Sequence, residues 1–157
     1  MKKCIFLFFI PLFTLAQLNR EVETDSLISF AKQYQGTKYC YGNCTPKSGF
    51  DCSGFVYYVF GHFNIKVPRA SLDYEKQGRI IQIDSARKGD IIVFTGTKPK
   101  NRKPGHVGIV ISNSGGDLKF IHSSSGKKAN GIIITDYSSS PYYKSRFIKI
   151  VRVRGLK

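Results

Sequence analysis

A short turn followed by an apolar run with helical spacing, at residues 49–63, constrains this chain most strongly. Asp51 is a residue type that commonly caps the N-terminus of a helix, and Cys52 would then be the first helical residue. At that end of a helix the dipole and the unpaired backbone N–H groups favour the thiolate of Cys52, which is the nucleophilic form. The alternative is that Cys52 is a small buried residue, because free cysteines are often buried. The apolar positions on one face of the helix are Phe55, Val56, Val59, Phe60 and Phe63.

Composition predicts one folded domain with a strong positive charge. The chain has 157 residues, of which 41% are hydrophobic, and its formal net charge is +15. This length suits one domain, and the charge attracts polyanions such as nucleic acid, acidic membrane surfaces or anionic cell-wall polymers. The sequence has no RNA-binding aromatic signature, zinc-finger spacing or glycine-rich phosphate loop, so we expect no nucleic-acid partner. We expect the domain to be a monomer.

Residues 1–16 have the pattern of a secretory signal peptide. Lys2 and Lys3 precede an apolar stretch at residues 4–15, and the small residue Ala16 marks a cleavage site. The stretch is too short for a stable membrane span; the alternative is a buried N-terminal helix. We therefore predict export to the periplasm or cell envelope, or secretion, and a single domain at residues 17–157.

The cysteine count bears on the identity of the reactive thiol. Removing residues 1–16 leaves Cys40, Cys44 and Cys52, and an odd count in an exported protein indicates one pair and one free thiol. Cys40 and Cys44 are close enough in sequence to form a disulfide that closes a small loop. The alternatives are two free thiols, or half of a metal site that lacks a second pair of ligands.

The order of the predicted elements indicates an α+β fold. A helix is predicted at residues 24–35, with Thr24 or Asp25 as its cap, and a short helix at residues 71–77, with Ser71 as its cap. Helices come first and an antiparallel sheet follows, which is an α+β order. The predicted strands are residues 79–83, 91–94, 106–111, 118–123, 131–135 and 146–153.

The hairpin formed by two of these strands brings two histidines together. If Ser112 pairs with Leu118 across the turn, Gly108 lies opposite His122. Side chains alternate along a strand, so His106 shares a face with Gly108 and lies diagonal to His122, about 7–8 Å away. A register slip of one residue would place the two histidines on opposite faces.

A thiol at a helix start and two neighbouring histidines meet the requirements of nucleophilic acyl transfer. We assign Cys52 as the nucleophile, His106 as the base and then the acid, and His122 as the residue that orients His106. The alternative is that the two histidines are only hydrogen-bonded polar residues at a strand edge. His62, near the end of the Cys52 helix, is predicted to be a surface cation stabilised by the helix dipole.

Several motifs together resemble the NlpC family of cell-wall cysteine peptidases. They are Gly49-Phe50-Asp51-Cys52-Ser53-Gly54-Phe55-Val56, Lys88-Gly89-Asp90-Ile91-Ile92-Val93-Phe94, Gly105-His106-Val107-Gly108-Ile109-Val110 and Phe120-Ile121-His122-Ser123. The resemblance implies a papain-like fold in which N-terminal helices pack on an antiparallel sheet of five to six strands. It implies hydrolysis of peptidoglycan stem peptides, either at the γ-D-glutamyl–diamino acid bond or at the D-alanyl–diamino acid cross-link. It implies no metal or organic cofactor. The competing functions are an amidase or acyltransferase that uses the same thiol, and a non-catalytic basic wall-binding domain.

The resemblance also assigns further site residues. Tyr39 matches a tyrosine that stabilises the oxyanion, and Tyr41 is its close neighbour. Asp51 and Ser53 resemble residues that contact the amino group of the substrate, although Asp51 could serve only as the helix cap. The chain departs from the family pattern at Lys38, where a proline is usual. It also has a long basic loop, which we expect to steer the enzyme to the anionic envelope surface through Lys98, Lys100, Arg102 and Lys103.

Overall fold

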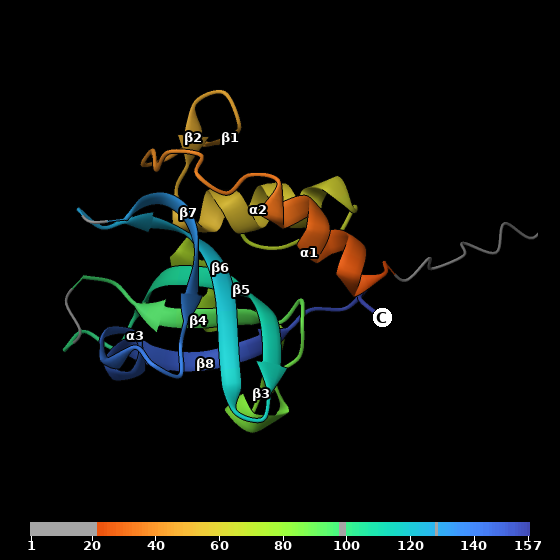
Figure 1. The fold of residues 1–157 in the computed structure, drawn as a ribbon, viewed down its shortest axis with the longest axis vertical. Coiled ribbons are helices and arrows are strands. Elements are labelled where there is room, and N and C mark those ends of the chain that lie inside the picture. The colour runs from red at the N-terminus through yellow and green to blue at the C-terminus, as the bar shows by residue number, and fades with distance from the viewer. Residues whose placement is uncertain (1–21, 98–99, 128) are drawn as a thin grey trace, which may run out of the picture.

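Two helices lie over one side of a six-stranded antiparallel sheet in the computed structural model of the chain (Figure 1). The structure describes residues 22–97, 100–127 and 129–157. The predicted signal peptide lies outside these residues and stays a prediction. The helices are α1 (Thr24–Lys32), α2 (Cys52–His62) and α3 (Pro141–Arg146), with the 3-10 helices η1 (Ser71–Glu75) and η2 (Ile83–Ser85). The strands are β1 (Cys44–Thr45), β2 (Gly49–Phe50), β3 (Arg79–Ile81), β4 (Ile91–Thr95), β5 (Pro104–Ser114), β6 (Asp117–Ser125), β7 (Asn130–Asp136) and β8 (Phe147–Arg152).

Helix α2 begins at Cys52, as predicted. The carboxylate of Asp51 caps it by accepting a hydrogen bond from the backbone N–H of Gly54 at 2.6 Å. The predicted apolar face is buried except at Phe63, which is partly buried and packs against the core. The preceding β1–β2 hairpin lies at the end of α2 that carries Cys52 (Figure 1). Helix α2, which follows Cys52, and the β1–β2 hairpin, which precedes it, together fix the position of this thiol.

Helix α1 is shorter than predicted and has a different cap. It ends at Lys32 rather than residue 35, because the backbone N–H of Gly36 donates to the carbonyl of Ile132 in β7 and leaves the helical ladder. Its N-cap is Glu23, whose side chain makes no capping hydrogen bond. The hydroxyl of Thr24 donates instead to the carbonyl of Lys157. The predicted cap at Thr24 or Asp25 was therefore wrong.

The sheet has the strand order β3-β8-β4-β5-β6-β7, and all of its neighbouring pairs are antiparallel. Both faces are apolar: Ile91 and Val93 of β4 point toward the helices, whereas Ile92 and Phe94 belong to a second core on the other face. This arrangement confirms the predicted α+β class with five to six strands. None of the helices in the described part of the chain is long and apolar enough to cross a bilayer.

The hairpin between β5 and β6 differs from the prediction at its tip. The turn has two residues instead of five, and Asn113 rather than Ser112 pairs with Leu118. A β-bulge between Val110 and Ser112 then shifts the register back, so that Val110 pairs with Phe120 as predicted. The two differences cancel before the strands reach the histidines.

The short helix predicted at residues 71–77 is a 3-10 helix that ends at Glu75. Ser71 is its first residue and not its cap; the cap position is Ala70, and no side chain forms a capping hydrogen bond there. The strand predicted at residues 79–83 ends at Ile81, where η2 follows after one residue.

Candidate active site

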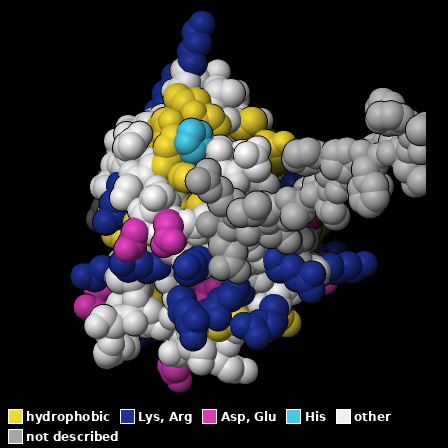
Figure 2. Space-filling view, turned by 90° about the vertical axis from the view of Figure 1, so that its right-hand side faces the viewer, with side chains coloured by type: hydrophobic (Ala, Val, Ile, Leu, Met, Phe, Trp, Pro, Cys, Tyr) yellow, Lys and Arg dark blue, Asp and Glu magenta, His cyan; other side chains and the backbone are white. Residues whose placement is uncertain are grey.

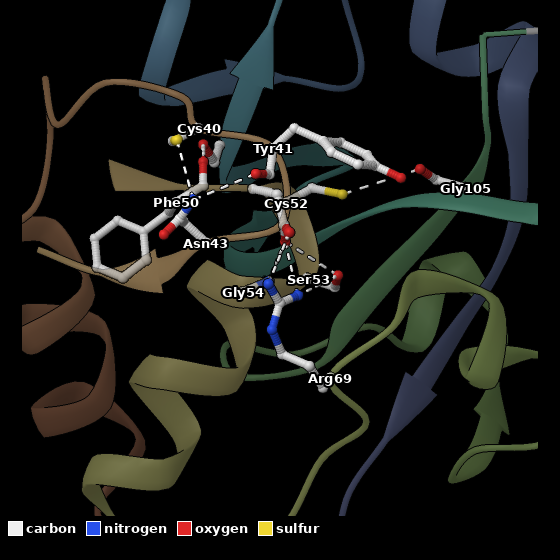
Figure 3. A network of polar contacts seen from close by, with 11 residues as sticks. Cys40, Tyr41, Asn43, Phe50, Cys52, Ser53, Gly54, Arg69 and Gly105 are labelled. Atoms are coloured by element: carbon white, nitrogen blue, oxygen red, sulfur yellow. Dashed lines mark hydrogen bonds and ion pairs between the residues drawn. The ribbon is translucent and has the colours of Figure 1, made fainter. Parts of the chain in front are cut away.

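The thiol of Cys52 lies against the start of β5. Its Sγ atom is 3.9 Å from the carbonyl oxygen of Gly105, the residue before His106 (Figure 3). Cys52 is buried, and burial raises the pKa of its thiol despite the opposing effect of nearby backbone N–H groups. The backbone N–H groups at the helix start thus favour the thiolate as expected, but burial outweighs them and the net pKa of the thiol is raised.

The two predicted histidines share one face of the hairpin. Nε2 of His106 lies 3.0 Å from Nδ1 of His122, and the rings are perpendicular to each other. Gly108 makes this approach possible, since a Cβ atom there would lie 3.1 Å from Cβ of His122 and 2.7 Å from Phe120. The predicted register at the site is thus confirmed.

The second nitrogen of His122 also has a partner. Nε2 lies 2.9 Å from the hydroxyl of Thr135 in β7 and 3.5 Å from the hydroxyl of Tyr143 in α3. The ring is buried and stacks on Phe120. Thr135 pairs with Phe120 across β6 and β7, so it is a diagonal neighbour of His122. Pairing the ends of the predicted strands, Ser123 with Gly131, would have missed it, because the real register pairs Ser123 with Ile132 and a one-residue slip moves Thr135 to the other face.

Burial also decides the charge of the two rings. Desolvation, with the nearby positive charge of Arg146, lowers the pKa of His106 to about 4. Desolvation likewise lowers the pKa of His122 well below its usual value. Near neutral pH the site therefore holds a thiol and two neutral imidazoles, rather than a thiolate–imidazolium pair.

Asp51 and Ser53 are both held by an arginine that the sequence analysis did not identify as a site residue. Arg69 donates from Nη1 to Oδ1 of Asp51 at 3.0 Å and from Nη2 to Oδ2 at 2.8 Å, and from Nη1 to Oγ of Ser53 at 3.3 Å. Ser53 in turn donates to Asp51. Arg69 points toward the start of α2 beside Ser53 and Gly54 (Figure 3). Asp51 is thus a helix cap and half of a bidentate ion pair. No motif in the sequence links Arg69 to it.

Of the two candidate tyrosines, Tyr39 is partly buried and Tyr41 is exposed. Burial raises the pKa of Tyr39 to about 12, and the neighbouring charges of Cys52 and Asp51 add to this effect. Tyr41 is 87% exposed. A parallel bridge between Tyr39 and Phe50 positions Tyr39 next to the residues that precede Cys52.

The predicted disulfide between Cys40 and Cys44 is not formed, and both are free thiols in the structure. Sγ of Cys40 accepts a hydrogen bond from Nδ2 of Asn43 at 3.2 Å. Cys44 lies in β1 and lines a small pocket beside α2 with Tyr57 and Gly61. The two thiols therefore have different surroundings, although they are close in sequence.

The remaining predicted features lie away from the thiol. His62 is exposed in the last turn of α2, as predicted, and its ring stacks on Phe30 with a centroid distance of 3.9 Å. In the basic loop, Arg102 donates to the carbonyls of Ser145 and Phe147, so it fastens the loop to the adjoining elements. Lys98 lies outside the described residues. Within residues 22–97, 100–127 and 129–157, no three His, Cys, Asp or Glu side chains are placed to hold a metal ion.

Comparison with known proteins finds relatives that match most of this chain. A gamma-DL-glutamyl hydrolase of Bacillus subtilis (strain 168) is 35% identical over 151 residues, which cover 95% of this chain and 35% of the relative. A protein named murein DD-endopeptidase MepS/murein LD-carboxypeptidase from Escherichia coli (strain K12) is 31% identical over 136 residues, covering 86% of this chain and 65% of the relative. The chain thus spans about a third of the first relative and just under two thirds of the second.

Solved structures and a family profile agree. The crystal structure of an NlpC/P60 family protein from Bacillus cereus ATCC 10987 superposes with a TM-score of 0.71 at 25% identity, and the match covers 83% of this chain and 40% of that one. The sequence profile of the NlpC/P60 family matches residues 36–152. These residues are about three quarters of the sequence, and the chain belongs to the NlpC/P60 family.

Proposed function

We propose that this chain is a cysteine peptidase that hydrolyses peptidoglycan stem peptides at the cell envelope. The observation that carries the proposal is the placement of Cys52, at the start of α2 and against the strand that carries the His106–His122 pair. The bonds named for the relatives, gamma-DL-glutamyl and murein DD linkages, support a stem-peptide substrate. The scissile bond is therefore the γ-D-glutamyl–diamino acid bond or the D-alanyl–diamino acid cross-link.

His106 activates the thiol as a general base. Because His122 occupies its Nε2, the nitrogen left for the thiol is Nδ1. As Sγ attacks the carbonyl carbon of the scissile amide, the thiol proton passes to Nδ1. When the carbon–nitrogen bond breaks, His106 returns this proton to the leaving amine, and a thioester to Cys52 remains. Water then attacks the thioester carbon and gives a proton to His106. The carbon–sulfur bond breaks, the carboxylic acid product leaves, and His106 returns the proton to Sγ of Cys52.

In this proposal two groups stabilise the oxyanion of each tetrahedral intermediate. The first is the set of backbone N–H groups at the start of α2 beside Cys52, where the helix dipole favours negative charge. The hydroxyl of Tyr39 adds a second donor. Because its pKa is about 12, it keeps its proton at neutral pH and can donate it.

A digest of purified muropeptides, analysed by mass spectrometry, tests the proposal. We expect cleavage within the stem, at a rate that falls to background in Cys52→Ala. Cys52→Ser is the matched control for the fold, because it replaces the thiol with a hydroxyl of similar size and should retain the fold. Intact stems released from their glycan would indicate an amidase instead, and no turnover by the wild type would overturn the proposal.

Export is part of the proposal and has its own test. The apolar stretch at residues 4–15 after Lys2 and Lys3 supports it. We expect the mature protein, isolated from the envelope fraction of its native host, to begin at Gln17 in N-terminal sequencing. A protein that keeps residues 1–16 in the cytosolic fraction would contradict it.

A further inference from the structure

A groove of about 1670 Å³ lies at the end of α2 that is opposite Cys52. It forms where residues 62–66, at the end of α2 and just after it, meet the start of β3 and the end of β8 with the chain that follows it. Helix α2 has 11 residues and is about 16 Å long, so the groove is separate from the thiol. Figure 2 faces the side of the molecule at which the C-terminus lies and shows Lys and Arg side chains spread across it.

The lining of this groove is basic. Lys66, Arg79, Arg152 and Arg154 line it, and none of its described lining residues is acidic. Arg152 is compensated, because Nε lies 2.7 Å from Oδ1 of Asp90. Lys66, Arg79 and Arg154 are exposed and form no ion pair within the part of the chain that the structure describes. Among the residues that the structure describes, the groove therefore presents three cations without an ion-pair partner.

One pair of these positive charges is expected to destabilise the sheet. Arg79 of β3 lies directly opposite Arg152 of β8 in the antiparallel register. Like charges directly opposite each other destabilise a sheet. Asp90 offsets the charge of Arg152, whereas no described acidic residue offsets that of Arg79. An anionic ligand in the groove would supply the missing compensation.

The other lining groups indicate the class of that ligand. Asn64 and Gln77 contribute side-chain amides, which can hydrogen-bond to hydroxyl groups. Phe30 covers one face of the His62 ring and packs edge-on with Phe63, so the described lining has no series of free aromatic rings on which successive nucleic-acid bases could stack. Cations spread along an open groove suit a polymer with repeated negative charges better than one small anion.

We propose that this groove binds an anionic polysaccharide of the cell envelope and holds the enzyme near its substrate. The inference rests on the proposed function for its location at the envelope. It places the main polyanion contact in the groove rather than in the basic loop at residues 98–104.

Binding of the full chain to immobilised glycans tests this inference. The probes are polygalacturonate as a carboxylated glycan, dextran sulfate as a sulfated one, uncharged dextran, and a DNA duplex. The groove variant combines Lys66→Gln, Arg79→Gln and Arg154→Gln. The matched control combines Lys32→Gln, Lys47→Gln and Lys144→Gln, exposed positions that lose the same charge.

We expect the wild type to bind at least one anionic glycan, weaken with salt, and leave dextran unbound. The groove variant should lose at least about tenfold in affinity and the control less than about twofold, because nearby charges dominate a screened interaction. Equal losses in both variants, or tighter binding to DNA than to the glycans, would overturn the inference. Cleavage of soluble muropeptides should be unchanged in both variants. If neither the wild type nor the variants cleaved muropeptides but glycan binding were intact, the proposed peptidase activity would be refuted and the proposed glycan-binding groove would stand.

Discussion

Nε2 of His106 and Nδ1 of His122 lie 3.0 Å apart, so one of these two nitrogens donates a hydrogen bond to the other. A base that accepts the thiol proton at Nδ1 must carry its own proton at Nε2. His122 then carries its proton at Nε2 and donates it to the hydroxyl of Thr135. Because His122 is neutral, it orients His106 without the charge stabilisation that a carboxylate would give to the imidazolium.

The first prediction concerns the acid limb of the pH profile. In the proposed mechanism neutral His106 acts as the base, and its pKa is lowered to about 4. We expect kcat/KM to stay constant as pH falls below the ordinary imidazole value of about 6.5 and to drop only near pH 4. The measurement is kcat/KM for a soluble stem peptide between pH 3.5 and 8. A stem with amidated carboxyl groups controls for ionisation of the substrate, and a limb near 6.5 with that stem would contradict the prediction.

Thr135→Val tests the far end of the histidine pair. The substitution keeps the shape of the side chain but removes the acceptor for the Nε2 proton of His122. Thr135 is a positioning residue, so we expect kcat to fall about tenfold with little change in KM, which is a part of the roughly 10²–10⁴-fold that general acid–base catalysis contributes. Nitrogen-15 NMR of the histidine rings should show a mixture of tautomers in place of one.

Thr135→Ser is the matched control and should restore both the rate and the single tautomer, because it keeps the hydroxyl. If Thr135→Val lowered kcat without changing the ring tautomers, the hydroxyl would not act through His122.

The sequence predicted which residues meet at the centre of the candidate site, but it did not predict the contacts around them. Cys52, His106 and His122 follow from local periodicity and one hairpin, and the bulge near Val110 corrected a turn that had been placed wrongly. Arg69 could not be found, because its partner Asp51 lies 18 residues away on another element and no repeat or spacing connects them. The Cys40–Cys44 bridge was wrong because sequence proximity does not fix the direction of side chains.

Gly108→Ala tests the close packing that lets the histidines meet. A Cβ at this position would lie 2.7 Å from Cδ2 of Phe120 and 3.1 Å from Cβ of His122, so one of the two rings must move. We expect a loss of about 2 kcal/mol in the free energy of unfolding, typical of overpacking, together with a large fall in kcat. Urea unfolding and steady-state kinetics measure the two effects.

Gly61→Ala provides the comparison for that variant. Gly61 lies within α2, and nothing lies within 4 Å of a Cβ added there. We expect a gain of about 0.5 kcal/mol from helix propensity and unchanged activity. If the two variants had equal free energies of unfolding, the close packing at Gly108 would not exclude a Cβ atom there.

Asp51→Asn separates the two roles of this side chain. Asparagine caps helices as well as aspartate does, but its amide cannot form the bidentate ion pair with Arg69. We expect the free energy of unfolding to fall by about 2 kcal/mol, below the range for fully buried pairs because Arg69 is partly exposed. Arg69→Lys keeps the charge without the fork and should lose less.

The same variant tests whether Asp51 also contacts the substrate. Stems with free and acetylated amino termini are compared by kcat/KM in the wild type and in Asp51→Asn. We expect the preference between them to change by less than about threefold, because Arg69 already compensates the carboxylate and weakens its attraction for an ammonium group. A variant that keeps its stability but loses this preference would show instead that the carboxylate binds the substrate's amino group.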